Sequence, residues 1–200
     1  MTRGLLLCTL LVAALAGCAR AAPPSGVAAT TATPSPDDCI EIVVSSSAAP
    51  PEDVRTTATE VVHGTFDGYG PSRWNTPDGH RPSKLEAQEK PARLIRSLQF
   101  TPIEQIVGTG SSLDRAMVRG GVSGCDRVSF DPVALLAPGD GYVFFLMPVT
   151  DSEGSMAGDL TLIEAWPVHE DGSVSTTFLG DLPFAEAREW IVNGPKPRPS

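Results

Sequence analysis

The alternation of apolar and polar positions between residues 39 and 194 predicts a domain made mostly of β-strands. The predicted strands cover residues 39–44, 60–67, 94–107, 113–119, 127–130, 142–149, 160–168 and 173–178. Residues 142–149 are apolar on both faces, which predicts a central strand that is covered twice. Pro102 lies inside the longest run, so we expect that strand to be bulged or to lie at an edge.

Helix signals flank these strands. The segment Pro50–Asp53 pairs proline with acidic residues, as the first turn of a helix does. A closing helix is expected with Asp181 as its cap, Pro183 in its first turn and Gly194 as its stop, packed on the sheet. Residues 83–86 have the spacing of a capping box.

The last hairpin can form in two registers. A two-residue turn would place Trp166 and Val168 on the face of polar residues. A three-residue turn with Gly172 in a left-handed conformation places them with Val174 and Phe178. We predict the three-residue turn because it gathers the apolar side chains on one face.

Together these elements predict a mainly β fold, a small closed or half-closed antiparallel barrel with a short N-terminal helix and a C-terminal helix packed on the sheet. Four segments carry a resemblance: Thr59–Phe66, Arg73–Gly79, Phe100–Ile103 and Ala137–Leu146. Their order resembles a family of uncharacterised actinobacterial secreted or lipid-anchored proteins, and it is similar to OB-like barrels of the netrin/TIMP type. The family resemblance implies no assigned activity.

The first residues have the pattern of an export signal. Arg3 precedes a twelve-residue apolar run, 5–16, whose helical length of ~18 Å is too short for a ~30 Å hydrocarbon core. The run ends in Leu15-Ala16-Gly17-Cys18, which resembles the lipobox of bacterial lipoproteins. That resemblance implies acylation of Cys18 and removal of residues 1–17. The alternative is an ordinary secretory signal in which Cys18 is incidental.

The predicted organisation follows from this start. Residues 1–17 form the signal, 18–38 the lipidated cysteine with a disordered tether, 39–194 a single domain, and 195–200 a disordered tail. The tether is rich in Ala, Pro, Ser and Thr, so it has too little apolar surface to fold. We therefore expect the protein on the extracytoplasmic face of the cell membrane, held through the lipid on Cys18.

Charge narrows the class of partner. The net charge of −9 disfavours nucleic acid, and it becomes −10 when Arg3 leaves with the signal. Residues 73–96 form an exception, with six basic and three acidic side chains. This segment predicts contact with an envelope protein or an anionic envelope component; the alternative is a solvated loop.

Two cysteines remain in the predicted domain. Cys39 and Cys125 would lie outside the cell, where disulfides persist, so we expect them to be bonded to each other. Two buried free thiols are the alternative. A third interpretation, a catalytic cysteine paired with a histidine, is excluded if the thiol is oxidised.

No motif indicates catalysis, a metal or a cofactor. The three histidines, His63, His80 and His169, have no spacing that is typical of metal ligands. The glycine-rich segment 108–112 lacks the third glycine of a nucleotide-binding loop and the strand and helix that such a loop joins. The sequence therefore predicts no catalytic residue, no metal site and no cofactor.

One loop stands out as a binding candidate because a tryptophan lies there among polar turn residues. If the side chain is exposed, it is the best ligand anchor of the chain; the alternative is that it folds back to cap the barrel. The candidate binding residues are Arg73, Trp74, Asn75, Asp78, His80 and Arg81.

These observations predict a lipid-anchored extracytoplasmic binding domain without enzymatic activity. Two alternatives stay open: a hydrolase whose site is assembled from distant residues, and a purely structural envelope protein.

Overall fold

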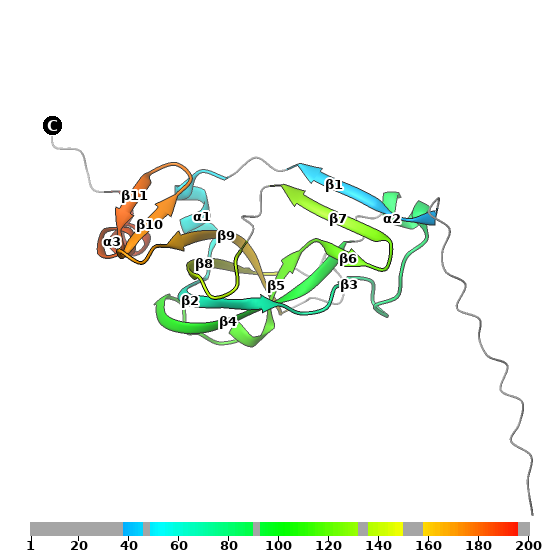
Figure 1. Cartoon of the computed structure of the whole chain (residues 1–200), viewed down its shortest axis with the longest axis horizontal. Coiled ribbons are helices and arrows are strands. Elements are labelled where there is room, and N and C mark those ends of the chain that lie inside the picture. The colour runs from blue at the N-terminus through cyan, green and yellow to red at the C-terminus, as the bar shows by residue number, and fades with distance from the viewer. Residues whose placement is uncertain (1–37, 46–48, 90–92, 132–135, 150–157, 196–200) are drawn as a thin grey trace, which may run out of the picture. The chain divides into compact units, whose positions relative to one another are not determined.

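A computed structural model describes residues 38–45, 49–89, 93–131, 136–149 and 158–195, all within one compact unit that spans 34–200. The signal, Cys18, almost all of the tether and the last five residues lie outside the described residues. The described part is mainly β, with three α-helices and one short 3-10 helix among its strands (Figure 1).

Most predicted strands are present, with some bounds shifted. The strands are β1 Glu41–Ser45, β2 Glu60–Tyr69, β3 Arg73–Trp74, β4 Leu94–Val107, β5 Ala116–Arg119, β6 Gly121–Ser123, β7 Asp126–Asp131, β8 Gly141–Pro148, β9 Leu160–Val168, β10 Ser173–Thr176 and β11 Gly180–Pro183. The helices are α1 Pro51–Thr57, α2 Lys84–Glu89, η2 Leu113–Arg115 and α3 Phe184–Asn193. Residues 113–115 were expected to be strand but form η2, and β10 ends two residues before Phe178.

The larger sheet has a partly ring-like arrangement. Its order is β11-β10-β9-β5-β4-β2-β8, and β8 also pairs with β9. Five strands, β2, β4, β5, β9 and β8, thus pair in a cycle. Most pairings are antiparallel as predicted, but β5 pairs with β9 in parallel, and so does β1 with β7 in the second, smaller sheet.

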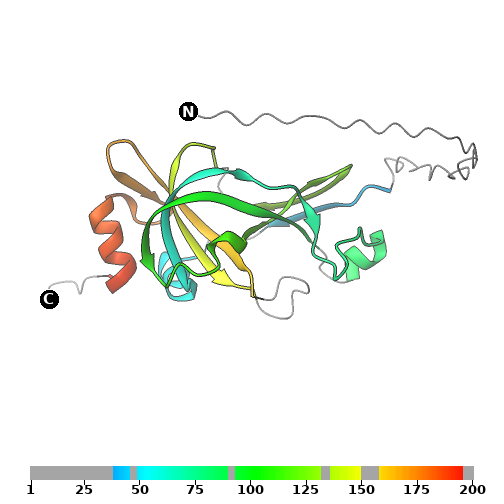
Figure 2. The same ribbon diagram turned by 90° about the horizontal axis from the view of Figure 1, so that it is seen from below.

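Side chains on the two faces of β8 enter two different cores, which confirms that this strand is central. Phe144 and Leu146 pack on one side with Phe66. Val143 and Phe145 pack on the other side against α1 and α3. Figures 1 and 2 both show α3 and the β10–β11 hairpin at one end of the larger sheet, and β1, β7 and α2 at the other.

The predicted irregularity of the long strand is confirmed as a bulge. The pairing of β2 with β4 jumps from His63–Glu104 to Gly64–Pro102, so Ile103 has no partner and is 62% exposed. Gly64 is required here because a Cβ atom would lie 2.7 Å from the carbonyl oxygen of Thr101.

The last hairpin has the predicted three-residue turn. Gly172 adopts a φ of 79°, and its amide donates to the carbonyl of His169. Val168 pairs with Val174, and Trp166 shares their core. Phe178 does not join them, because the strand ends before it and leaves the ring 54% exposed.

The closing helix starts differently from the prediction. Gly194 ends α3 as expected, and Ala187 and Ile191 are buried against the sheet. Pro183 occupies the cap position without a side-chain cap. Asp181 is not the cap because it lies in β11, where its carboxylate accepts a hydrogen bond from Ser175.

The smaller sheet, β1-β7-β6, is joined to the larger one by a third core. Ile40, just before β1, and Val128 of β7 pack there with Trp74 and Leu94, and Ala87 of α2 completes the cluster. This core surrounds the loop that holds the candidate binding residues.

Candidate functional site

The position of Trp74 follows from the pairing of β3 with β4. Trp74 pairs with Leu94, and Arg73 pairs with Ile95. Neighbouring residues of a strand point to opposite faces, so Trp74 enters the third core and is only 3% exposed, while Arg73 stays at the surface. Trp74 is therefore not an exposed anchor; of the two interpretations, the one in which the ring folds into the core holds.

Three of the other candidates shape the loop itself. Asn75 accepts a hydrogen bond from the amide of Arg93 at 2.7 Å and ties the loop to the start of β4. The Asp78 carboxylate accepts from the amide of His80, as in an Asx turn. The imidazole of His80 is 81% exposed and lies 3.5 Å from Asp78. None of these three lines the cavity described below.

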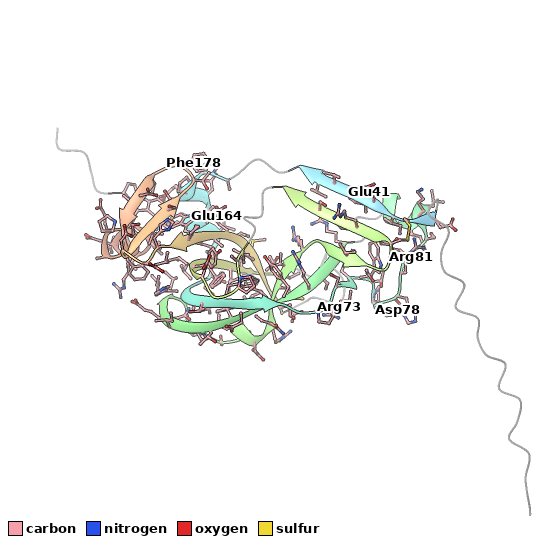
Figure 3. The ribbon with its side chains drawn as sticks, viewed as in Figure 1. Glu41, Arg73, Asp78, Arg81, Glu164 and Phe178 are labelled. Atoms are coloured by element: carbon pink, nitrogen blue, oxygen red, sulfur yellow. A yellow bond between two sulfur atoms is a disulfide. The ribbon has the colours of Figure 1, made fainter. Side chains whose placement is uncertain are left out.

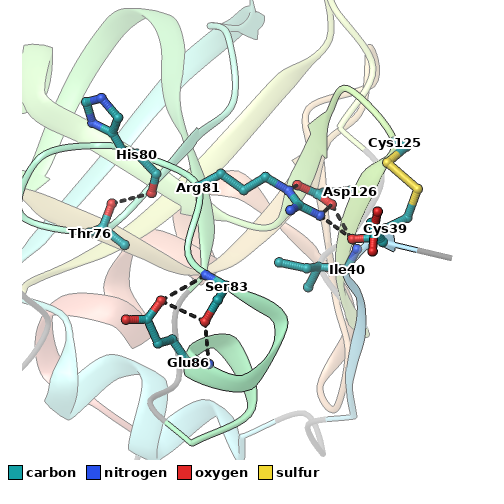
Figure 4. A network of polar contacts seen from close by, with 10 residues as sticks. Cys39, Ile40, Thr76, His80, Arg81, Ser83, Glu86, Cys125 and Asp126 are labelled. Atoms are coloured by element: carbon teal, nitrogen blue, oxygen red, sulfur yellow. Dashed lines mark hydrogen bonds and ion pairs between the residues drawn. A yellow bond between two sulfur atoms is a disulfide. The ribbon is translucent and has the colours of Figure 1, made fainter. Parts of the chain in front are cut away.

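Arg81 has a specific partner from β7. Its Nε donates to Oδ2 of Asp126 at 2.6 Å and its Nη2 donates to Oδ1 at 2.8 Å. The same guanidinium donates to the backbone carbonyl of Asp38. Oδ1 of Asp126 also accepts from the amide of Ile40 at 2.8 Å. These contacts fix the first residues of the domain to β7 (Figure 4).

The predicted disulfide adds a covalent link at the same place. Cys39 and Cys125 are bonded across 86 residues of sequence, with their Cα atoms 5.5 Å apart. Each cysteine is adjacent in sequence to a member of the hydrogen-bonded network, Ile40 or Asp126. The point at which residues 1–37 join the domain is thus held by a disulfide and a charged network together.

The surroundings of the carboxylate in this network favour its ionised form. The hydrogen bond from Arg81 lowers the pKa of Asp126 below its ordinary value of 3.8, although burial acts in the opposite direction. The amide of Ile40 and the indole N–H of Trp74 also lower this pKa. The indole nitrogen of Trp74 is buried, and among the described residues it has no hydrogen-bond partner with standard geometry.

A cavity of about 320 Å³ opens beside the network. It brings together three of the predicted residues, Arg73, Trp74 and Arg81, with residues that the sequence did not single out. The further lining residues are Ser72, Gly79, Ser123, Gly124, Cys125 and Asp126. Figure 3 shows Arg73 and Arg81 at the same end of the described unit, near β3. From the sequence, Asp126 could have been expected at this cavity only because it follows Cys125 of the predicted disulfide.

In the described part of the basic segment 73–96, three arginines have different surroundings. Arg81 is neutralised by Asp126, and the guanidinium of Arg96 lies 3.6 Å from the centre of the Tyr69 ring. Arg73 contacts the sulfur of Met117 at 4.0 Å, and sulfur is a weak acceptor. Among the described residues, no carboxylate pairs with Arg73.

The histidines take part in separate contacts. The His63 ring lies against the Phe184 ring in a tilted arrangement, with the ring centroids 4.7 Å apart, and burial lowers the pKa of His63. In the described ranges, no group of three His, Cys, Asp or Glu side chains could hold a metal ion.

The third histidine belongs to a short polar chain on the surface of the last hairpin. Nε2 of His169 lies 2.7 Å from the hydroxyl of Ser175, which donates to Asp181 at 2.6 Å. In a catalytic triad the histidine lies between the acid and the serine and accepts the seryl proton. Here the serine lies in the middle and its proton goes to the carboxylate, so this geometry does not activate a nucleophile.

Helices in the described ranges are all too short or too polar to cross a membrane. Compared with known proteins, the chain matches no family model, no curated protein and no solved structure. The resemblances drawn from the sequence therefore stay predictions.

Proposed function

We propose that this chain is a lipid-anchored extracytoplasmic binding domain. In this account Cys18 carries the lipid, residues 19–38 form the tether, and the cavity beside Arg73 receives the ligand. The observation that carries the proposal is the position of that cavity, directly beside the network that fixes residues 38–40 to β7. Because residues 38–40 are fixed to β7, the cavity lies close to the point where the proposed tether joins the domain.

We further propose that the ring of β2, β4, β5, β9 and β8 is an OB-like barrel. The closed cycle of pairings supports this assignment. OB folds use the loop between their first two strands for binding. In this chain the corresponding connection, residues 70–93, contains β3, α2 and every binding residue expected from the sequence.

The anchor is tested by the intact mass of the protein recovered from membranes. The proposal predicts a chain that begins at Cys18 and carries acyl chains there, and a Cys18→Ser variant that leaves the membrane fraction or keeps residues 1–17. An unmodified Cys18 in the membrane-bound protein would refute the anchor.

The binding role is tested by affinity purification from membranes after cross-linking. We compare Arg73→Gln with Arg188→Gln, which removes an equally charged side chain on α3, far from the cavity in sequence and paired with Glu104. The proposal predicts that Arg73→Gln loses partners that Arg188→Gln retains. If both variants recover the same partners as the unchanged protein, the site is wrong and the structural envelope role becomes the better account.

A further inference from the structure

We propose that the cavity beside Arg73 binds a carboxylate group, carried by a small organic acid or by the end of a peptide. This inference rests on the proposed binding function and names the chemistry of its ligand. It follows from the charges, donors and size of the cavity.

The first observation is the charge of the lining residues. Three of the residues that line the cavity are charged, namely Arg73, Arg81 and Asp126. Both oxygens of Asp126 are already occupied by Arg81, and one of them also by the amide of Ile40. The lining residues together thus carry one excess positive charge, that of Arg73, which matches a singly charged anion better than a phosphate dianion.

The second observation is the direction of the remaining hydrogen bonds. The hydroxyl oxygen of Ser72 accepts from the amide of Val122 at 3.3 Å, so its own proton is left to donate elsewhere. Ser123 supplies a second hydroxyl to the lining. A guanidinium binds a carboxylate through two parallel hydrogen bonds, and serine hydroxyls can donate further hydrogen bonds to the same group.

The third observation is the space. A volume of about 320 Å³ corresponds to roughly ten water molecules at ~30 Å³ each, enough for one or two amino-acid residues. Gly79 and Gly124 border this space, and a Cβ atom at either position would meet nothing within 4 Å. Neither lining glycine therefore contributes a side chain that would narrow this space.

The test is calorimetric titration of the intact chain in a non-ionic detergent. The probes are N-acetyl-alanine, N-acetyl-alanyl-alanine, the C-terminal amide of that dipeptide, and inorganic phosphate. We expect both acids to bind and the amide to bind at least tenfold more weakly. Tighter binding of the dipeptide acid assigns the site to peptide ends, and equal binding of the two acids assigns it to the carboxylate alone.

Variants then assign the effect to one side chain. Arg73→Gln should weaken acid binding at least tenfold, and Arg73→Lys should weaken it less. Arg188→Gln should bind the acids as the unchanged chain does. Equal binding of acid and amide, binding of neither acid, unaltered binding by Arg73→Gln, or preference for phosphate would each overturn the carboxylate assignment. The comparison of acid with amide uses the unchanged chain, so it holds even if a variant fails to fold.

These outcomes are distinguishable from a failure of the proposed function. If cross-linked partners still depend on Arg73 while acid and amide bind equally, the binding role stands and the carboxylate assignment fails. If no partner depends on Arg73 but the acids bind, the cavity recognises carboxylates and the proposed partner-binding role fails.

Discussion

Arg81 and Asp126, 45 residues apart in the sequence, form a two-pronged ion pair that holds the first strand of the domain in place. The carboxylate is almost fully buried, with 3% of its side chain exposed, whereas 38% of the arginine side chain is exposed. The buried partner also accepts the amide of Ile40. The pair thus fixes both the loop after β3 and the start of β1 to β7.

Replacing Asp126 with Asn should lower the free energy of unfolding by about 2 kcal/mol at pH 7, the cost of breaking a charged hydrogen bond to a partly exposed arginine. The folded-state pKa of Asp126 lies below 3.8, so its stabilisation is present above about pH 4 and is lost as the pH falls through that lower value. Urea unfolding at pH 7 and pH 3 should show a difference between the two proteins that shrinks at pH 3. A difference that stays constant would contradict the role of the ionised pair.

The disulfide should contribute strongly to stability because it closes a long loop. For 86 residues of separation, the chain-entropy argument allows up to about 4.6 kcal/mol. Cys39→Ser, Cys125→Ser and the double variant should therefore unfold at similarly lower urea concentrations. Reducing agent should shift the unchanged protein toward the variants without shifting them further. An unchanged midpoint in all three variants would rule out this contribution.

Trp74 and Arg73 should separate folding from binding. Trp74→Ala empties a buried position among Ile40, Leu94 and Val128 and should cost about 3–5 kcal/mol. Arg73→Gln changes an exposed side chain and should alter stability by less than about 0.5 kcal/mol. Thermal unfolding of both variants checks this, and a marked loss of stability in Arg73→Gln would assign Arg73 to the fold rather than to the ligand.

His63 should make the contact with α3 sensitive to pH. Burial lowers its pKa below the ordinary 6.5, with a smaller opposing effect of Glu104, which itself pairs with Arg188. Stability should be full above pH 6.5 and should decline as the pH falls below that value, because the unfolded chain then binds the proton more readily. Unfolding measured from pH 8 to pH 5 should show a shallower decline for His63→Gln.

The matched control is His80→Gln. The imidazole of His80 is 81% exposed, so its replacement removes a histidine without removing a packed contact, and the profile of His63→Gln is compared with that of this variant. Identical profiles for the unchanged protein and His63→Gln would contradict the assignment to His63.

Local patterns were enough to predict the long regular elements. The bounds of β4 were predicted to the residue and those of β8 to within one. The apolar run of β8 is continuous, whereas β4 mixes apolar and polar residues and is followed by Gly108. The capping box was also predictable, and Ser83 and Glu86 make both of its hydrogen bonds. These features depend on residues that are close in sequence.

The site depended on contacts that no local pattern encodes. The parallel pairing of β1 with β7 and the ion pair of Arg81 with Asp126 join segments more than forty residues apart. The loop sequence alone did not determine whether Trp74 is buried. Its burial follows from the pairing of Trp74 with Leu94. The sequence therefore indicated the correct loop but not the cavity that it lines.

The central claim is that the cavity beside Arg73 is where this protein meets its ligand. The most direct measurement places a photo-reactive residue at Val122, an exposed position next to the lining residue Ser123, and at Val192, an exposed position on α3. After illumination of membranes, the account predicts a discrete cross-linked species from position 122 that is absent from position 192 and is lost when Arg73→Gln is added. The same species from both positions, or one that survives Arg73→Gln, would contradict it.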